Sequence, residues 1–403
     1  MSVVSWPRRL ALFALRASAV VVALVLVAAG LDAATYDAKV WRADFEHLKR
    51  EMAQRYANLD WMVSHRGLDL RALDERTSAA IDGAHSRVLA GLALRRFVRA
   101  FGDPHLRLVL DDRTVPTSGA TPAALVTPGG RSAVASCEVA GYEAGDYGFR
   151  FPFDHLKGWA RVREGHFPTG LAGDIGVLRI ASFGEDQYLA ACLAVFRNGN
   201  TERELRLAVR ARLQRELIAA IDELKSRDVQ RMLVDVSGNG GGTEWVTDIV
   251  ALLTGRELVR RSARLVSPQC DRSRVWLGEA VCPVLAPEGE PMRLAGTGRW
   301  NGKLFVLTDH GTGSASEDFV AWLQQNGVAV VIGARTAGAG CGYVDGGGRI
   351  RLEAAPFDVM APNCARFLND GTNEIEGIKP DVEIAMDGTE SSAAALLAAL
   401  TGR

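Results

Sequence analysis

The chain has 403 residues, of which 48% are hydrophobic and 24% charged, so its composition argues against a disordered protein and allows two or three domains. Lysine and arginine number 47 and aspartate and glutamate 48, which gives a formal net charge of -1. No block of like charges stands out. This balance excludes the electrostatic footprint that binding to nucleic acid or to an anionic membrane surface requires.

The first 34 residues have the pattern of an export signal. Arg8, Arg9 and Arg16 precede an apolar run from Ala17 to Leu31, and small residues follow. The run is short for a membrane span and suits the apolar part of a signal peptide. We therefore predict a signal peptide over residues 1–34, with an uncleaved N-terminal anchor as the alternative. Either one places the rest of the chain in the periplasm or outside the cell.

Six cysteines would then meet an oxidising compartment, where an even number permits disulfides. Their spacing favours a pair between Cys270 and Cys282 and another between Cys341 and Cys364, although sequence alone does not determine the connectivity. The sequence contains no CxxC motif and no cluster of His and Cys that suggests zinc. We expect neither a metal nor a cofactor.

Three regions follow the export signal. Residues 36–112 have helical periodicity, with Phe45, Leu48 and Met52 repeating at intervals of three and four, and are predicted to form a helical domain. Residues 113–170 break into Gly, Pro and short β-like runs, without the apolar and glycine signals of a PDZ domain. Residues 171–403 are predicted to form an α/β domain that carries the candidate site residues described below.

Apolar strands alternate with helices in this last region. Gly176 to Ile180 is predicted to be a strand and Glu202 to Ser226 a long amphipathic helix. The runs RMLVD, KLFVLT and VAVVIG follow as further strands. Buried strands that alternate with helices indicate an α/β core with largely parallel pairing.

A glycine cluster follows the strand RMLVD, in the sequence VSGNGGG. The consecutive glycines from Gly240 to Gly242 let the backbone turn sharply and expose N–H groups, so the turn can hold an oxyanion or be purely structural. A P-loop is excluded because Thr243 and Glu244 follow where Lys and Ser or Thr are needed. Thr243 also breaks the dinucleotide-binding pattern GxGxxG.

Ser314 is the candidate nucleophile. It lies at a predicted strand-to-helix turn, in the sequence GTGSASED, where Gly313 and Ala315 leave its hydroxyl unobstructed. The alternative is a helix cap, because Glu317 three residues later completes a capping box. The GxSxG elbow of the α/β-hydrolases is absent, so that fold is not supported.

Four motifs together resemble the tail-specific, or C-terminal processing, peptidase family. They are DVSGNGGG, TGSASEDF, VIGARTAG and EGIKPDV, in the order and spacing of that family. The resemblance extends from about Tyr36 to Val382. It implies a fold related to the spiral of crotonase and Clp protease, preceded by a helical domain.

The resemblance also implies the parts of an active site. Ser314 would be the nucleophile. The backbone N–H groups of Gly241 and Ala315 would form the oxyanion hole, with Gly240 and Gly242 as alternatives.

One residue departs from the branch of the family that uses a Ser/Lys dyad. The TxGK segment of that branch is TAGAG here, so Ala339 stands in the place of the Lys, and no lysine lies between Lys303 and Lys379. A methyl group cannot accept a proton. The chain is therefore similar to a second branch, that of tricorn and the CPAF-type proteases, which uses a His and a carboxylate.

The second branch implies two partners for Ser314. His105, in GDPHLRL, would be the general base, because a neutral imidazole can deprotonate a serine; His310 ranks second. Glu374, in NEIEGIKPD, would orient the imidazole as the third member of a triad does. Glu376 is the alternative carboxylate.

We therefore expect an exported serine endopeptidase that hydrolyses polypeptides through an acyl-enzyme on Ser314. Nucleic acid is not expected as a partner, and membrane attachment is expected only through the N-terminal segment. The alternative is a non-catalytic binding protein on the same scaffold, similar to the repeats of the interphotoreceptor retinoid-binding protein. The missing Lys favours this alternative, whereas the presence of Ser314, His105 and a carboxylate favours the enzyme.

Overall fold

A computed structural model gives the architecture of the chain. The structure describes residues 22–23, 27, 30–110, 133–267, 271–279, 282–344 and 347–402. Most of the predicted export signal lies outside the described residues. No described helix has both the length and the hydrophobicity that a membrane span requires.

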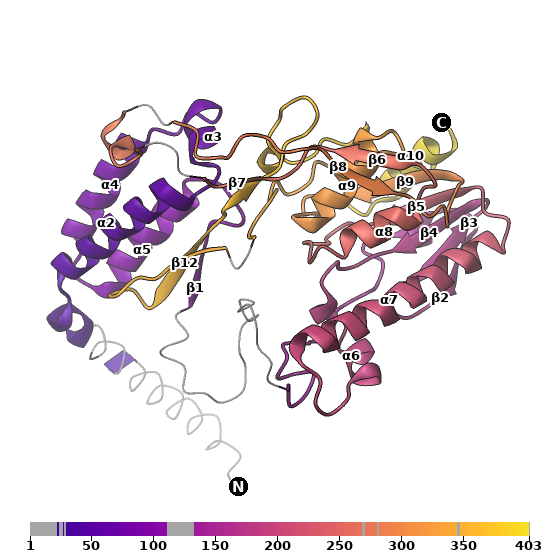
Figure 1. Ribbon diagram of the computed structural model, residues 1–403, viewed down its shortest axis with the longest axis horizontal. Helices are drawn as coiled ribbons and strands as arrows, with labels where there is room; N and C mark the ends of the chain where they lie inside the picture. Colours follow the sequence, from indigo (N-terminus) through magenta and orange to yellow (C-terminus); the bar gives the residue numbers. More distant parts are fainter. Residues whose placement is uncertain are drawn as a thin grey trace, which may run out of the picture.

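The predicted helical domain contains four helices, which lie together in Figure 1: α2 (Ala38–Arg55), α3 (Leu59–Ser64), α4 (Leu70–Asp82) and α5 (Arg87–Arg99). Asp69 and Ser86 cap the first turns of α4 and α5 by accepting backbone N–H groups. The predicted repeat of Phe45, Leu48 and Met52 is fully buried in the core between the helices. The periodicity of the sequence thus predicted the buried face of α2.

Residues from the C-terminal part of the chain complete this helical core. Strand β1 (Arg107–Leu110) pairs antiparallel with β12 (Phe357–Ala361), which pairs antiparallel with β11 (Gly348–Ile350). Figure 1 shows β12 beside β1, next to the helices. Ile375 is also buried in this core. The chain therefore returns to the helical part after its central sheet, and this return brings the segment around Glu374 close to the segment that carries His105.

The central sheet has seven strands in the order β14-β10-β9-β5-β4-β3-β2. The five strands from β14 to β4 are parallel, and β3 and β2 continue the sheet antiparallel. The four strands predicted between Gly176 and Gly333 are present as β4, β5, β9 and β10, and their pairing is parallel as predicted. The bounds are β2 (Trp159–Arg163), β3 (Thr169–Ala172), β4 (Ile175–Arg179), β5 (Arg231–Asp235), β9 (Lys303–Thr308), β10 (Ala329–Gly333) and β14 (Val382–Glu383).

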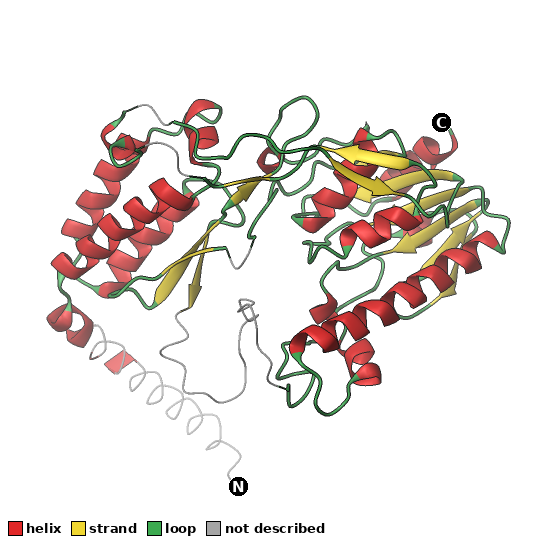
Figure 2. Ribbon diagram, viewed as in Figure 1, coloured by secondary structure: helices red, strands yellow, loops and turns green. Residues whose placement is uncertain are grey.

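Helices cover both faces of this sheet (Figure 2). Along β5, Met232 and Val234 join the core beneath α7 (Glu202–Lys225), α8 (Val246–Leu252) and α9 (Ala315–Gln325). Leu233 joins the core beneath α10 (Glu390–Thr401). Side chains alternate between the faces of a strand, so this division separates two layers. The other elements are α6 (Leu189–Val195), β6 (Glu257–Arg260), β7 (Arg264–Leu265), β8 (Met292–Ala295) and β13 (Cys364–Ala365).

Two disulfides lie between described residues. The predicted pair of Cys341 and Cys364 is confirmed. A second bond joins Cys137 to Cys192, a pair that the spacing of the cysteines did not indicate. Cys282 is also disulfide-bonded, and Cys270, its predicted partner, lies outside the described residues.

Candidate active site

Ser314 lies at the turn between β9 and α9, as predicted, and is half-buried. Its backbone has φ 56° and ψ -116°, and Asp228 is the other described non-glycine residue with positive φ. An L residue adopts this conformation only when its surroundings hold it there. The N–H of Ser314 donates to Oε2 of Glu317 over 2.9 Å. The side chain of Glu317 therefore caps the turn at Ser314, as the predicted capping box requires.

The glycine turn lies directly against Ser314. A Cβ built on Gly241 would lie 2.8 Å from Cβ of Ser314 and 2.8 Å from N of Ala315, and the φ of Gly241 is 111°. This approach is open only to glycine. The N–H of Gly241, however, donates to Oδ1 of Asn239 over 3.0 Å. The prediction that Gly241 presents a free N–H group is therefore wrong in this conformation.

Two other N–H groups remain available beside Ser314. The N–H of Ala315 has no acceptor among the described residues, because it opens α9. The same holds for Gly240, where a built Cβ would meet no atom within 4 Å. Gly242 faces the backbone of Phe183 and Gly184 instead, with a built Cβ 2.0 Å from each. Ala315 and Gly240 thus have N–H groups that no described group occupies.

His105 lies between α5 and β1, with its ring against Tyr343. Nδ1 of His105 is 2.8 Å from the carbonyl oxygen of Ala339. A carbonyl can only accept, so Nδ1 carries the hydrogen and Nε2 of the neutral ring keeps its lone pair. Burial lowers the pKa of His105 below its usual 6.5, and the charge of Asp103 offsets only part of this effect. The ring is thereby kept in the neutral form that a general base needs.

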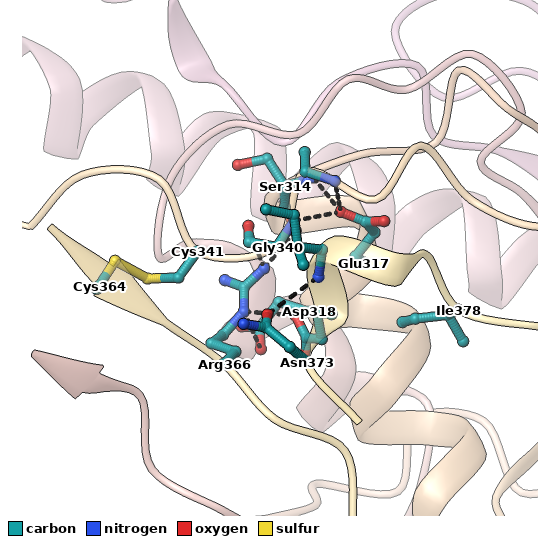
Figure 3. A network of polar contacts seen from close by, with 12 residues as sticks. Ser314, Glu317, Asp318, Gly340, Cys341, Cys364, Arg366, Asn373 and Ile378 are labelled. Atoms are coloured by element: carbon teal, nitrogen blue, oxygen red, sulfur yellow. Dashed lines mark hydrogen bonds and ion pairs between the residues drawn. A yellow bond between two sulfur atoms is a disulfide. The ribbon is translucent and has the colours of Figure 1, made fainter. Parts of the chain in front are cut away.

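The carboxylate of Glu317 holds the segment around Ala339 in place. It accepts the N–H groups of Gly338, Ala339 and Gly340 over 2.7, 3.0 and 2.8 Å, and the hydroxyl of Thr336 over 2.6 Å. Figure 3 shows this network beside Ser314. Glu317 is fully buried. One side chain thus fixes both the turn at Ser314 and the carbonyl that accepts from His105.

Glu374 does not orient His105, and its predicted role is corrected. Arg260 forms an ion pair with Oε1 of Glu374, and Nε of Arg366 donates to Oε2 over 2.7 Å. Both carboxylate oxygens are therefore occupied, and the side chain is fully buried. Nη2 of Arg366 also donates to the carbonyl oxygens of Ser314 and Gly340, over 2.7 and 2.9 Å. Glu374 supports the site through Arg366 rather than through the imidazole.

The alternatives from the sequence do not contact the imidazole either. Oε1 of Glu376 accepts from Nε1 of Trp61 and from Nε of Arg66, each over 2.8 Å. His310 is exposed.

Asp103 is a carboxylate that sequence reasoning passed over, although it lies in the same GDPH motif as His105. It accepts the backbone N–H of His105 over 2.9 Å and the side chains of Tyr56 and Asn58 over 2.9 and 3.1 Å. Burial raises the pKa of Asp103, and the positive charge of a protonated His105 would oppose this shift. No motif would have indicated Arg366, which acts through main-chain carbonyls.

Ser314 and His105 come together through Ala339. The carbonyl of Ala339 accepts from the imidazole, and Cβ of Ala339 lies 3.6 Å from a Cβ built on Gly313, the residue before Ser314. Among the described residues, no hydrogen bond joins the side chains of Ser314 and His105. Catalytic hydrogen bonds are often long before substrate binds.

This fold and site define a serine-type peptidase. Residues 174–384 match the model of peptidase family S41, and this match covers more than half of the chain. The protein therefore belongs to peptidase family S41. This agrees with the resemblance of its four motifs to the tail-specific, or C-terminal processing, peptidases.

One protein is similar to this chain in sequence, and two solved structures are similar to it in fold. Over 173 residues, or 41% of the chain, the sequence is 27% identical to the chloroplastic carboxyl-terminal-processing peptidase 3 of Arabidopsis thaliana; the aligned part spans 28% of that protein. Mature CPAF in complex with lactacystin superposes with a TM-score of 0.61 at 13% identity, covering 89% of this chain and 97% of CPAF. A protein of Parabacteroides merdae gives 0.58 at 17% identity, covering 90% and 97%. These two likenesses confirm the predicted α/β fold with its N-terminal helical region.

Proposed function

We propose that the protein is an exported serine endopeptidase in which Ser314 attacks the peptide carbonyl and His105 is the general base. The observation that carries this proposal is the hydrogen bond from His105 to Ala339. The backbone carbonyl at the position of the missing Lys takes over the orienting role that a carboxylate has in other triads.

The protons can be followed through one turnover. Nε2 of His105 takes the proton of the Ser314 hydroxyl as Oγ forms a bond to the carbonyl carbon, and the imidazolium keeps its Nδ1–H on Ala339. The imidazolium then gives its proton to the leaving amine, which leaves an acyl-enzyme on Ser314. Water, deprotonated by the same imidazole, hydrolyses this ester.

The negative charge that develops on the substrate oxygen needs donors close to Ser314. The N–H groups of Ala315 and Gly240 are unoccupied by other described groups, and Ala315 opens a helix, where partial positive charge favours an anion. Each such donor contributes on the order of 3 kcal/mol to lowering the barrier. We therefore assign the oxyanion hole to Ala315 and Gly240.

The proposed location outside the cytoplasm has two supports. The sequence predicts a signal peptide or anchor over residues 1–34. The disulfides Cys137–Cys192 and Cys341–Cys364 suit an oxidising compartment. Cell fractionation tests this location, and a full-length cytoplasmic species with reduced cysteines would contradict it.

A fluorophosphonate probe tests the chemistry. It should label the full-length protein at Ser314, as mapped by mass spectrometry of the modified peptide. Ser314→Ala should abolish labelling. Ser316→Ala is the matched control, because the buried Oγ of Ser316 has no hydrogen-bond partner among the described residues and the variant should label normally. A folded wild-type protein that neither labels nor cleaves an unfolded polypeptide would favour the non-catalytic binding protein.

A further inference from the structure

A groove on the helical domain has no role in the chemistry described above. It has a volume of about 1320 Å³ and lies between α5 and the strands β1 and β12. Its lining is largely apolar and includes Trp41, Val88, Leu92, Leu108 and Phe357. Val88 remains 66% exposed and Leu110, at the end of β1, 78% exposed. A cluster of exposed apolar side chains is typical of a binding site, whereas apolar residues scattered singly over a surface are not.

Three arginines line this groove from α5. Arg87, Arg95 and Arg99 all belong to the lining, and none of them forms an ion pair with any described residue. Most other arginine side chains in the described part of the chain have carboxylate or carbonyl partners, as Arg42 has in Asp82. Two acidic residues of the lining are already engaged: Asp37 caps α2, and Asp103 accepts three hydrogen bonds. Glu353 is the third acid in the lining and Arg107 on β1 a fourth arginine, so four arginines face three acidic side chains.

Strand β1 offers a backbone edge along the same groove. It is the end strand of its three-stranded sheet, with β12 on one side and no described strand on the other. An extended peptide can pair with such an edge through main-chain hydrogen bonds, and its alternate side chains then enter neighbouring pockets. The edge, the apolar lining and the arginines are three different binding features at one place.

The groove leads to the candidate active site. Asp103 and Pro104 belong to its lining and immediately precede His105, and β1 begins two residues after His105. A chain that pairs with β1 would thus run towards the imidazole. The lining includes the residues on both sides of His105 in the chain, Pro104 and Leu106.

We propose that the groove between α5 and β1 binds an extended segment of the polypeptide substrate that is rich in apolar and acidic side chains. This proposal rests on the proposed peptidase function. The apolar side chains of the segment pack on Leu108 and Phe357, its carboxylates pair with Arg95 and Arg99, and its backbone pairs with β1. The groove therefore selects unfolded or extended chains of this composition before cleavage.

Peptide binding to the full-length Ser314→Ala protein tests this independently of catalysis. A fluorescein-labelled peptide of alternating valine and glutamate should bind, as measured by fluorescence anisotropy, and one of alternating valine and lysine should bind much more weakly. The double variant Arg95→Glu/Arg99→Glu should raise the Kd for the acidic peptide about tenfold, since two exposed attractions become repulsions. Methylation of alternate backbone nitrogens of the peptide should weaken binding as well, because it removes donors to the strand edge.

Arg96→Glu is the matched control. Arg96 is exposed on the same helix but does not line the groove, so this variant should leave the Kd unchanged. In the catalytically intact protein, the double variant should raise KM for an acidic polypeptide and leave kcat unchanged.

Equal Kd values for the acidic and basic peptides, or an equal effect of Arg96→Glu, would overturn the proposal. Loss of binding to anionic lipid vesicles in the double variant, with peptide binding intact, would assign the groove to a membrane instead. Normal peptide binding by a protein that cleaves nothing would support the groove and reject the peptidase function.

Discussion

The imidazole of His105 donates from Nδ1 to the main-chain carbonyl of Ala339 over 2.8 Å. By the resemblance to the family, Ala339 stands where the other branch has its lysine. Its carbonyl would orient His105, the base that we propose instead. A carbonyl stays neutral during proton transfer, and it therefore stabilises the imidazolium less than a carboxylate would.

The pH dependence of activity should reflect the lowered pKa of His105. The base must be neutral, so kcat/KM should fall as the pH falls through this pKa. Because burial lowers the pKa below 6.5, we expect the acid limb below pH 6.5. A profile of kcat/KM against pH measures it, and a half-maximal point above this value, or a limb that persists in His105→Ala, would contradict the assignment.

Asp103→Asn should move this acid limb further down. The charge of Asp103 raises the pKa of His105, so its removal should lower that pKa and extend activity to more acid pH. Asn keeps an oxygen that can accept hydrogen bonds. Because Asp103 is buried, thermal unfolding should be measured as well, to show that the variant is folded. If the acid limb of a folded variant stayed in place or moved to higher pH, the charge of Asp103 would not act on His105.

Ser314→Ala and His105→Ala should each reduce kcat by roughly 10³-fold or more. The double variant should be little worse than either single variant, because the two side chains act in one step. Steady-state kinetics on an unfolded polypeptide would measure this. Additive losses would mean that the two residues work independently.

Glu317→Gln should destabilise the protein and reduce kcat. The carboxylate accepts five hydrogen bonds, and the amide of Gln would direct its own N–H groups at donors, at a cost of about 3 kcal/mol. Denaturant unfolding gives the stability. Thr201→Ala is a control for the loss of a helix cap far from the site and should leave kcat unchanged. Wild-type stability and activity in Glu317→Gln would show that the network is dispensable.

Glu374→Gln should leave the pH profile in place while it lowers stability and kcat. The two carboxylate oxygens of Glu374 bind Arg260 and Arg366. The substitution therefore removes the negative charge that pairs with these two arginines, but it does not affect the imidazole directly. The acid limb of kcat/KM distinguishes the two roles. A clear displacement of that limb would restore Glu374 as the carboxylate partner of His105.

Removal of the disulfide between Cys341 and Cys364 should cost about 3 kcal/mol of stability, because it closes a loop with a sequence separation of 23. It should also lower kcat, since Cys341 follows Gly340, whose carbonyl binds Arg366. The matched control is the removal of Cys137–Cys192, a bond with a separation of 55 that lies away from Ser314. An equal loss of kcat in both double serine variants would indicate general destabilisation.

The sequence by itself predicted the main helices and strands and the turn that carries Ser314. The buried repeat of α2, the strands β5, β9 and β10 and the turn at Ser314 follow from local patterns of apolar and small residues, which depend on neighbours in the chain. The motif GDPH indicated His105 as the candidate base. The sequence also showed that position 339 carries Ala rather than Lys. The disulfide of Cys341 with Cys364 also joins cysteines that lie close in sequence.

Only the tertiary structure decided how the site residues are used. Glu374 and Glu376 both lie in a polar turn, and which of them contacts an arginine or a histidine depends on the return of the chain to the helical core. Gly241 gives its N–H to Asn239, and Ala339 acts through its carbonyl, which is identical in every residue type. Backbone groups and long-range ion pairs leave no pattern in a sequence, because they are set by where the fold places them.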